Sequence, residues 1–140
     1  MISYRSQISL SAELNSLPLF RRLVEDACLQ QADIDDQTCY DLKLAVDEAC
    51  TNIIEYGYAC MDPGSIILEI EIGPQAARIK ITDFGCPFEP VEIEAADADI
   101  STENGMENLG LFFIHQSCDL LDYQTSEAGN TLVLVKYLTG

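Results

Sequence analysis

The alternation of apolar and polar residues divides the chain into segments with the periods of strands and of helices. Residues 2–10 alternate with a period of two, as a strand with one buried face does. Apolar residues within 11–31 recur at helical spacing instead. Pro18 suits the first turn of a helix, so we predict that this helix starts near Leu17.

A second helix is predicted to begin near Asp35 or Asp36. Gly57 and the turn sequence "MDPG" end it. Its apolar residues form one stripe at helical spacing, consisting of Leu42, Val46, Ala49, Cys50 and Ile53. This stripe predicts that the helix packs one face against a core.

The remaining segments alternate between hairpins and a region without a clear period. Residues 65–72 and 76–83 read as two strands joined by a short turn. No period is evident from Gly85 to Asn108, which predicts a long and functional loop. A third helix is predicted from Gly110, and "LDYQTS" and "TLVLVKYL" form a closing hairpin.

This order of elements predicts an α+β fold with two layers, in which helices cover one face of a mixed, mostly antiparallel sheet. The 140 residues match the size of one domain. Hydrophobic residues make up 48% of the chain and charged residues 22%, which is ordinary for a globular protein.

The charge narrows the classes of ligand. The chain has 24 acidic residues against 7 Lys plus Arg, a net charge of -17. Nucleic acid requires a basic surface, so no direct binding of nucleic acid is expected. A basic protein partner is compatible with this charge. An anionic ligand such as a nucleotide would need backbone amides, a helix N-terminus or a metal ion to hold it.

Neither membrane insertion nor export is expected. No apolar run approaches the roughly 18 residues that a membrane-spanning helix needs. The first ten residues contain Arg5 and polar residues throughout, so they lack the core of a signal peptide. We therefore expect a cytoplasmic protein.

The six cysteines form no C-x-x-C pair, so a zinc knuckle or a thioredoxin-like motif is not expected. Several stand at apolar positions, where a free cysteine behaves as a small hydrophobe. We interpret them as reduced thiols of the core.

Two polar residues interrupt the second helix. Glu48 and Asn52 are four residues apart and share a face beside the apolar stripe. A half-buried Glu is suited to act as a general base, because partial burial raises its pKa. An Asn carbonyl one turn away is a hard oxygen ligand for Mg²⁺. A solvated helix edge would explain the same pair.

Two other stretches carry candidate chemistry. Asp83 ends a strand and could accept a hydrogen bond from the amine of adenine, and Gly85 would let the ring approach the backbone. Gly110 stands at a predicted helix N-terminus, which favours phosphate. Alone, each stretch could equally be an ordinary turn.

Together, "EACTNIIEYGY", "DFGCPF", "NLGLFFI" and "GNTLVLVK" resemble the Bergerat-type ATP-binding fold of histidine kinases and gyrase. More closely, the chain resembles the anti-sigma factor serine/threonine-protein kinases of bacterial partner-switching systems, for which "D-x-G-x-P-F" is typical. The resemblance covers nearly the whole chain. It implies one histidine-kinase-like ATPase domain over residues 1–140, with an ATP lid at about 86–108.

The resemblance also implies roles for individual residues. Glu48 is the general base that activates the attacking hydroxyl, and Asn52 coordinates the Mg²⁺ that bridges the ATP phosphates. Asp83 bonds the adenine amine with Gly85 beside it. The remaining ATP-binding positions are Asn108, Gly110 and Leu111 at the phosphates and Thr131 under the adenine.

The resemblance further implies protein partners. The chain would phosphorylate a STAS-type anti-anti-sigma protein and sequester a sigma factor, with the two partners competing for it. Arg22 on the first helix stands where related proteins often have an arginine that faces the partner, although a solvated helix arginine explains it equally well. Related proteins suggest a homodimer.

Two departures keep alternatives open. The stretch "MENLGL" has Glu107 and Asn108 where the family has two glycines. The loop 89–107 contains seven acidic residues and no Lys or Arg. One alternative is therefore a catalytically inactive module of the same fold that sequesters a regulatory partner without phosphoryl transfer. An unrelated α+β regulator is another.

Overall fold

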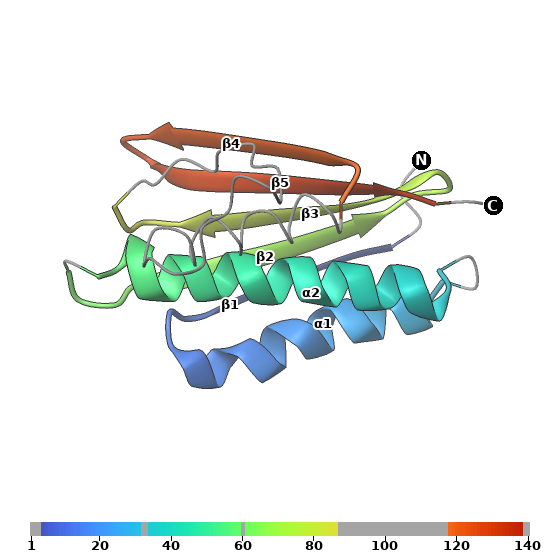
Figure 1. The fold of residues 1–140 in the computed structure, drawn as a ribbon, viewed down its shortest axis with the longest axis horizontal. Coiled ribbons are helices and arrows are strands. Elements are labelled where there is room, and N and C mark those ends of the chain that lie inside the picture. Colours follow the sequence, from blue (N-terminus) through green and yellow to red (C-terminus); the bar gives the residue numbers. More distant parts are fainter. Residues whose placement is uncertain (1–3, 32–33, 60, 87–117, 139–140) are drawn as a thin grey trace, which may run out of the picture.

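A computed structural model describes residues 4–31, 34–59, 61–86 and 118–138. Two helices, α1 and α2, cover one face of a five-stranded sheet with the order β1-β2-β3-β5-β4 (Figure 1). Every neighbouring pair of strands is antiparallel. The elements are β1 (Tyr4–Ser11), η1 (Leu14–Ser16), α1 (Leu17–Leu29), α2 (Asp36–Asn52), η2 (Ile53–Gly57), β2 (Ser65–Ile72), β3 (Ala76–Asp83), β4 (Leu120–Ser126) and β5 (Gly129–Tyr137). The predicted two-layer α+β fold is confirmed.

Both helices begin where their sequences indicate. Pro18 lies in the first turn of α1, where its missing N–H costs nothing. The carboxylate of Asp35 accepts a hydrogen bond of 2.8 Å from the backbone N–H of Thr38 and so caps α2. This bond lowers the pKa of Asp35. Within the described ranges, no helix is long and apolar enough to cross a lipid bilayer.

The core lies between the helices and the inner face of the sheet. The predicted stripe of α2 is buried, from Leu42 to Ile53. The inner positions of the central strands are buried with it and comprise Ile66, Leu68, Ile70, Ile72, Ile79, Ile81, Leu132 and Leu134. Their alternation with more exposed residues is the period of two that the sequence shows.

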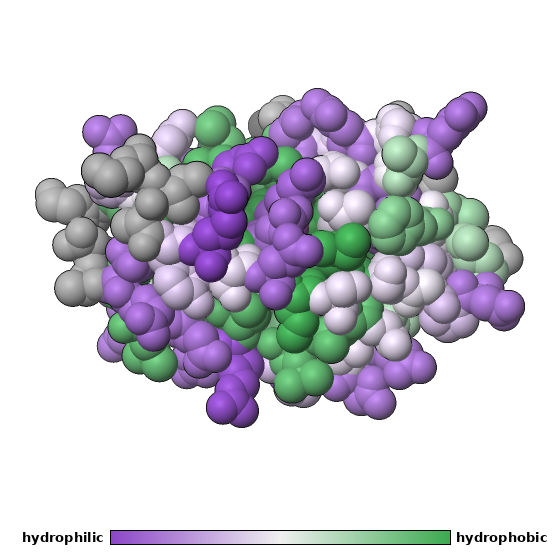
Figure 2. All heavy atoms as spheres, turned by 180° about the vertical axis from the view of Figure 1, so that it is seen from behind, coloured by the Kyte–Doolittle hydropathy of each residue, from purple (hydrophilic) through white to green (hydrophobic). Residues whose placement is uncertain are grey.

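The opposite face of the sheet carries charged residues in cross-strand pairs. Arg5 forms an ion pair of 2.9 Å with Glu71, and Lys80 lies 3.9 Å from Glu69. Seen from behind, the molecule shows apolar side chains near the middle of the view with hydrophilic side chains beside them (Figure 2). Partly exposed ion pairs of this kind contribute little to stability.

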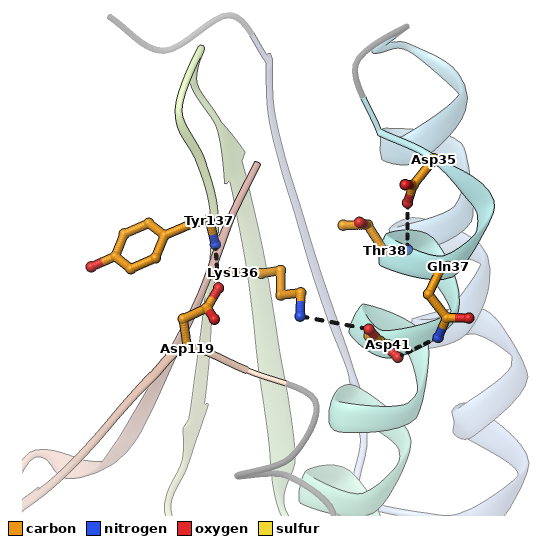
Figure 3. A network of polar contacts seen from close by, with 7 residues as sticks. All are labelled: Asp35, Gln37, Thr38, Asp41, Asp119, Lys136 and Tyr137. Atoms are coloured by element: carbon orange, nitrogen blue, oxygen red, sulfur yellow. Dashed lines mark hydrogen bonds and ion pairs between the residues drawn. The ribbon is translucent and has the colours of Figure 1, made fainter. Parts of the chain in front are cut away.

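A polar network fixes the first half of α2 to the end of β5 (Figure 3). Lys136 Nζ lies 3.6 Å from Asp41 Oδ2, and Gln37 donates a hydrogen bond of 2.9 Å to the same carboxylate. Asp119 accepts a bond of 2.6 Å from the backbone N–H of Tyr137. The ion pair between Lys136 and Asp41 joins helix to sheet towards the end of α2 opposite to Asn52.

The predicted ATP lid, apart from Cys86, lies outside the described residues. The same is true of Glu107 and of three predicted phosphate-site residues, Asn108, Gly110 and Leu111. The start of the helix predicted from Gly110, up to residue 117, also lies outside the described residues, and Leu120 belongs to β4.

Candidate functional site

The far end of α2 meets the far end of β3 through a backbone contact. Helix α2 continues into the π-helical turn η2, a form that often marks functional sites. The carbonyl of Gly57, which ends this turn, accepts a hydrogen bond of 2.6 Å from the N–H of Cys86. A Cβ on Gly85 would lie 2.3 Å from that same carbonyl oxygen. Position 85 therefore requires glycine, because the two backbones pack closely there. The residues next to Gly85 in the sequence do not indicate this contact.

Tyr58 reinforces this junction. Its ring is buried, and its hydroxyl donates a hydrogen bond of 2.8 Å to the carbonyl of Ser65. The same hydroxyl accepts a bond of 2.9 Å from the N–H of Phe84. Burial raises the pKa of Tyr58, so the hydroxyl stays protonated and can donate. One side chain thus holds the end of α2, the start of β2 and the end of β3 together.

Asp83 lies in this junction with only 1% of its surface exposed. Its Oδ1 accepts hydrogen bonds from the N–H of Gly85 at 2.9 Å and from Nδ2 of Asn130 at 3.0 Å. Asn130 also donates to the carbonyl of Gly85 at 2.9 Å. Within the described residues, both bonds of this carboxylate end on Oδ1. Its orientation is fixed, and Oδ2 can accept a hydrogen bond from a ligand.

The structure does not bring Thr131 to Asp83. Asp83 pairs across the strands with Asn130, whereas Thr131 pairs with Thr82, and adjacent residues of a strand face opposite sides of the sheet. Asn130 is buried with 3% exposure on the side of Asp83. The position next to Asp83 therefore belongs to Asn130, which the sequence reasoning missed.

Asn52 is the last residue of α2 and is buried with 7% exposure. Among the described residues, its Nδ2 has no hydrogen-bond partner. Leaving a buried polar group unsatisfied costs about 1–3 kcal/mol, which a polar ligand would offset. The side chain also has a carbonyl oxygen, the hard ligand that Mg²⁺ prefers. The unpartnered Nδ2 could donate a hydrogen bond to a ligand oxygen while the carbonyl oxygen contacts a metal, so this amide fits a site for a metal-bound ligand.

Glu48 lies one helical turn before Asn52 and is half-buried. Burial raises the pKa of Glu48, and the negative charges of Asp47 and Glu55 raise it further. Asp47 itself is held by Arg21 at 2.6 Å. A carboxylate whose pKa is raised toward neutrality is better suited to accept and release a proton. Glu48 thus has the environment expected of a general base.

The described residues form a cavity beside the junction and a groove between the helices. A cavity of about 280 Å³ adjoins the junction and is lined by Phe84, Gly85, Thr125, Ser126, Glu127, Gly129 and Asn130. A larger hollow of about 750 Å³, here called the α1–α2 groove, runs between the helices and is lined in part by Arg21, Arg22, Leu29, Tyr40, Lys43 and Asp47. The structure thus places Arg22, which is exposed, away from Asp83 on the outer side of the helix layer.

Residues 10–136 match the model of the histidine kinase-like ATPase domain. An anti-sigma F factor from Clostridium perfringens is 29% identical over 119 residues, which cover 84% of each chain. A serine-protein kinase RsbW from Bacillus thuringiensis is 32% identical over 103 residues, which cover 70% of this chain and 63% of the relative.

A solved structure has the same fold. The crystal structure of the RsbU and RsbW domains of a Mycobacterium tuberculosis protein matches with a TM-score of 0.71 at 18% identity. The match covers 97% of this chain and 33% of that one, so the chain spans about a third of its length. The chain belongs to the histidine kinase-like ATPase family, and it is similar to relatives named as an anti-sigma factor and as a serine-protein kinase.

Proposed function

We propose that the protein is an ATP-dependent serine kinase and anti-sigma factor of a partner-switching system. The observation that carries this proposal is the unsatisfied buried amide of Asn52, one turn from a half-buried Glu48. Buried polar groups are usually hydrogen-bonded, so this pair favours a bound polar ligand. Asp83, held at the same end of the fold by Asn130 and Gly85, adds a fixed acceptor for a purine amine.

Each residue has a separate role in this proposal. ATP with its Mg²⁺ supplies the phosphoryl group and neutralises the charge that develops during transfer. Asn52 would hold the metal through its carbonyl oxygen. Asp83 would accept a hydrogen bond from the adenine amine at Oδ2, while Asn130 and Gly85 keep the carboxylate in place. Glu48 would take the proton of the attacking serine hydroxyl.

The relatives and the α1–α2 groove support the proposed partners. Relatives named as an anti-sigma F factor and as a serine-protein kinase support a sigma factor and a STAS-type anti-anti-sigma protein as competing partners. Arg22 lines the groove and would contact the partner. We further propose that residues 1–140 form one ATPase domain with a lid at about 86–108, working in the cytoplasm as a homodimer.

A second candidate function has support of its own. The loop 89–107 carries seven acidic residues and no basic one, and Glu107 and Asn108 replace the expected glycines. Negative charge beside a triphosphate opposes binding by a few kcal/mol per close pair at an effective dielectric near 20. These residues favour a binding module that sequesters a partner without phosphoryl transfer.

Glu48→Gln should separate these two functions. The wild-type protein, given ATP labelled in the γ-phosphate and a STAS-type protein of the same organism, should label a serine of that protein. The variant should lose transfer by about 10²–10⁴-fold, because the proton acceptor is gone, and should keep its affinity for ATP. If the variant still transfers the label, Glu48 is not the base. If the wild type binds both molecules and transfers nothing, the binding module is the better account.

Glu48→Gln should also change stability with a defined pH dependence. Burial raises the pKa of Glu48 above its ordinary value of 4.5. As the pH rises from about 4.5 to this higher pKa, the carboxyl ionises more readily in the unfolded chain than in the folded one, so the folded state loses stability. The variant lacks this loss, so it should be more stable than the wild type at pH 7, and the difference should shrink below about pH 4.5. Urea unfolding at both pH values measures it. The exposed Glu13→Gln is the control, and a variant less stable than the wild type at pH 7 would contradict the assignment.

Asp83→Asn should test the adenine contact. The new amide can still accept the bonds from Gly85 and Asn130 through its oxygen, but its NH₂ group would meet the adenine amine. The variant loses this hydrogen bond and places two N–H donors against each other. ATP binding should therefore weaken by at least about tenfold, as measured by calorimetry. Thr131→Val, on the other face of the sheet, is the control and should leave the affinity unchanged. Equal losses in both variants would overturn the assignment of Asn130 over Thr131.

A further inference from the structure

Two cysteines meet at the end of the helix layer that lies away from Asp83. Cys28 is in the last turn of α1 and Cys39 is in the first turn of α2. Both are free thiols, and Cys39 is near enough to Cys28 to affect its pKa. Cys28 is part of the buried core, and Cys39 packs against that core while remaining half-buried. The two cysteines therefore lie at the same end of the helix layer and in the same part of the core, and Cys39 is the more exposed of the two.

The surroundings give the two thiols different reactivity. Burial raises the pKa of Cys28, and the neighbouring Cys39 and the negative charge of Glu25 raise it further. The positive charge of Lys43 lowers it. Cys28 is therefore a protonated thiol at neutral pH. Lys43 lies four residues after Cys39 and so shares its face of α2. A partly exposed thiol beside a cation is the kind that oxidants attack.

We propose that Cys28 and Cys39 form a redox-sensitive pair, which a peroxide converts into a disulfide that joins the end of α1 to the start of α2. The sulfur of Cys39 first attacks one peroxide oxygen, becomes a sulfenic acid and releases one water. The sulfur of Cys28 then attacks the sulfenic sulfur, and its proton leaves with the hydroxyl as a second water. The two thiols lose two electrons and two protons, and hydrogen peroxide is reduced to two waters.

The cross-link would act on the α1–α2 groove. Leu29 follows Cys28 and Tyr40 follows Cys39, and both are exposed residues that line one end of this groove. A bond between the cysteines fixes the spacing of the two helices at that end. An effect of oxidation on a docked partner rests on the proposed function, whereas formation of the disulfide does not, and the test below uses neither ATP nor a partner.

The test is mild oxidation of the purified folded protein with hydrogen peroxide, followed by blocking of free thiols and mass spectrometry without reduction. The expected product is a monomer that has lost two hydrogens, with one cross-linked pair of peptides containing Cys28 and Cys39. A reducing agent such as dithiothreitol should restore both thiols. The same oxidation in urea should give this pair at least about tenfold more slowly, because only the fold holds the thiols together.

Two variants make the outcome specific. Cys39→Ser should abolish the linked pair, and Cys118→Ser, another half-buried cysteine, should leave its yield unchanged. Circular dichroism checks that both variants are folded, and Cys28→Ala repeats the test from the other side of the pair. The proposal is overturned if the folded protein links other cysteines, if it oxidises only to sulfinic or sulfonic acids, or if folded and urea-unfolded chains give the pair equally fast.

Discussion

The contact between the carbonyl of Gly57 and the backbone of Gly85 and Cys86 determines where the site lies. Helix α2 and strand β3 belong to different layers, with the core between them for most of their length. The bond from Cys86 to Gly57 joins the layers at one end, and the lack of room for a Cβ at Gly85 shows how closely the two backbones approach. As a result Asn52, at the end of α2, and Asp83, at the end of β3, reach the same end of the fold. The ion pair between Lys136 and Asp41 lies towards the opposite end of α2 (Figure 3).

The polar residues at this junction do not serve stability equally. Asp83 is buried, but its Oδ1 accepts two hydrogen bonds and is therefore satisfied. Asn52 has an unsatisfied Nδ2 among the described residues, and Glu48 has a raised pKa because it is half-buried near two other carboxylates. Both features cost folding free energy and are typical of functional sites, where stability is exchanged for binding or catalysis. The rest of the helix follows the ordinary pattern of a buried stripe with an N-terminal cap.

The sequence predicted the features that depend on local periodicity. The stripe on α2, the start of α1 near Leu17 and the alternation of the strands follow from the spacing of apolar residues, and the structure confirms them. Local periodicity does not predict the pairing of Asp83 with Asn130, because this pairing depends on the register between two strands. The two residues are 47 positions apart in the chain. Neighbouring residues of a strand face opposite sides of the sheet. Whether Asn130 or Thr131 lies beside Asp83 therefore depends on the register. The reason for Gly85 was likewise hidden, since its partner Gly57 is distant in the chain.

Calorimetric titration with ATP, with and without Mg²⁺, on the wild type and on Asn52→Ala tests the central claim most directly. The account holds that the unsatisfied amide of Asn52 exists to hold a metal-bound nucleotide. It predicts binding by the wild type that depends on Mg²⁺ and that Asn52→Ala abolishes, while the variant stays folded. Wild-type binding that is indifferent to Mg²⁺ or to Asn52→Ala, or no binding at millimolar ATP, would contradict it.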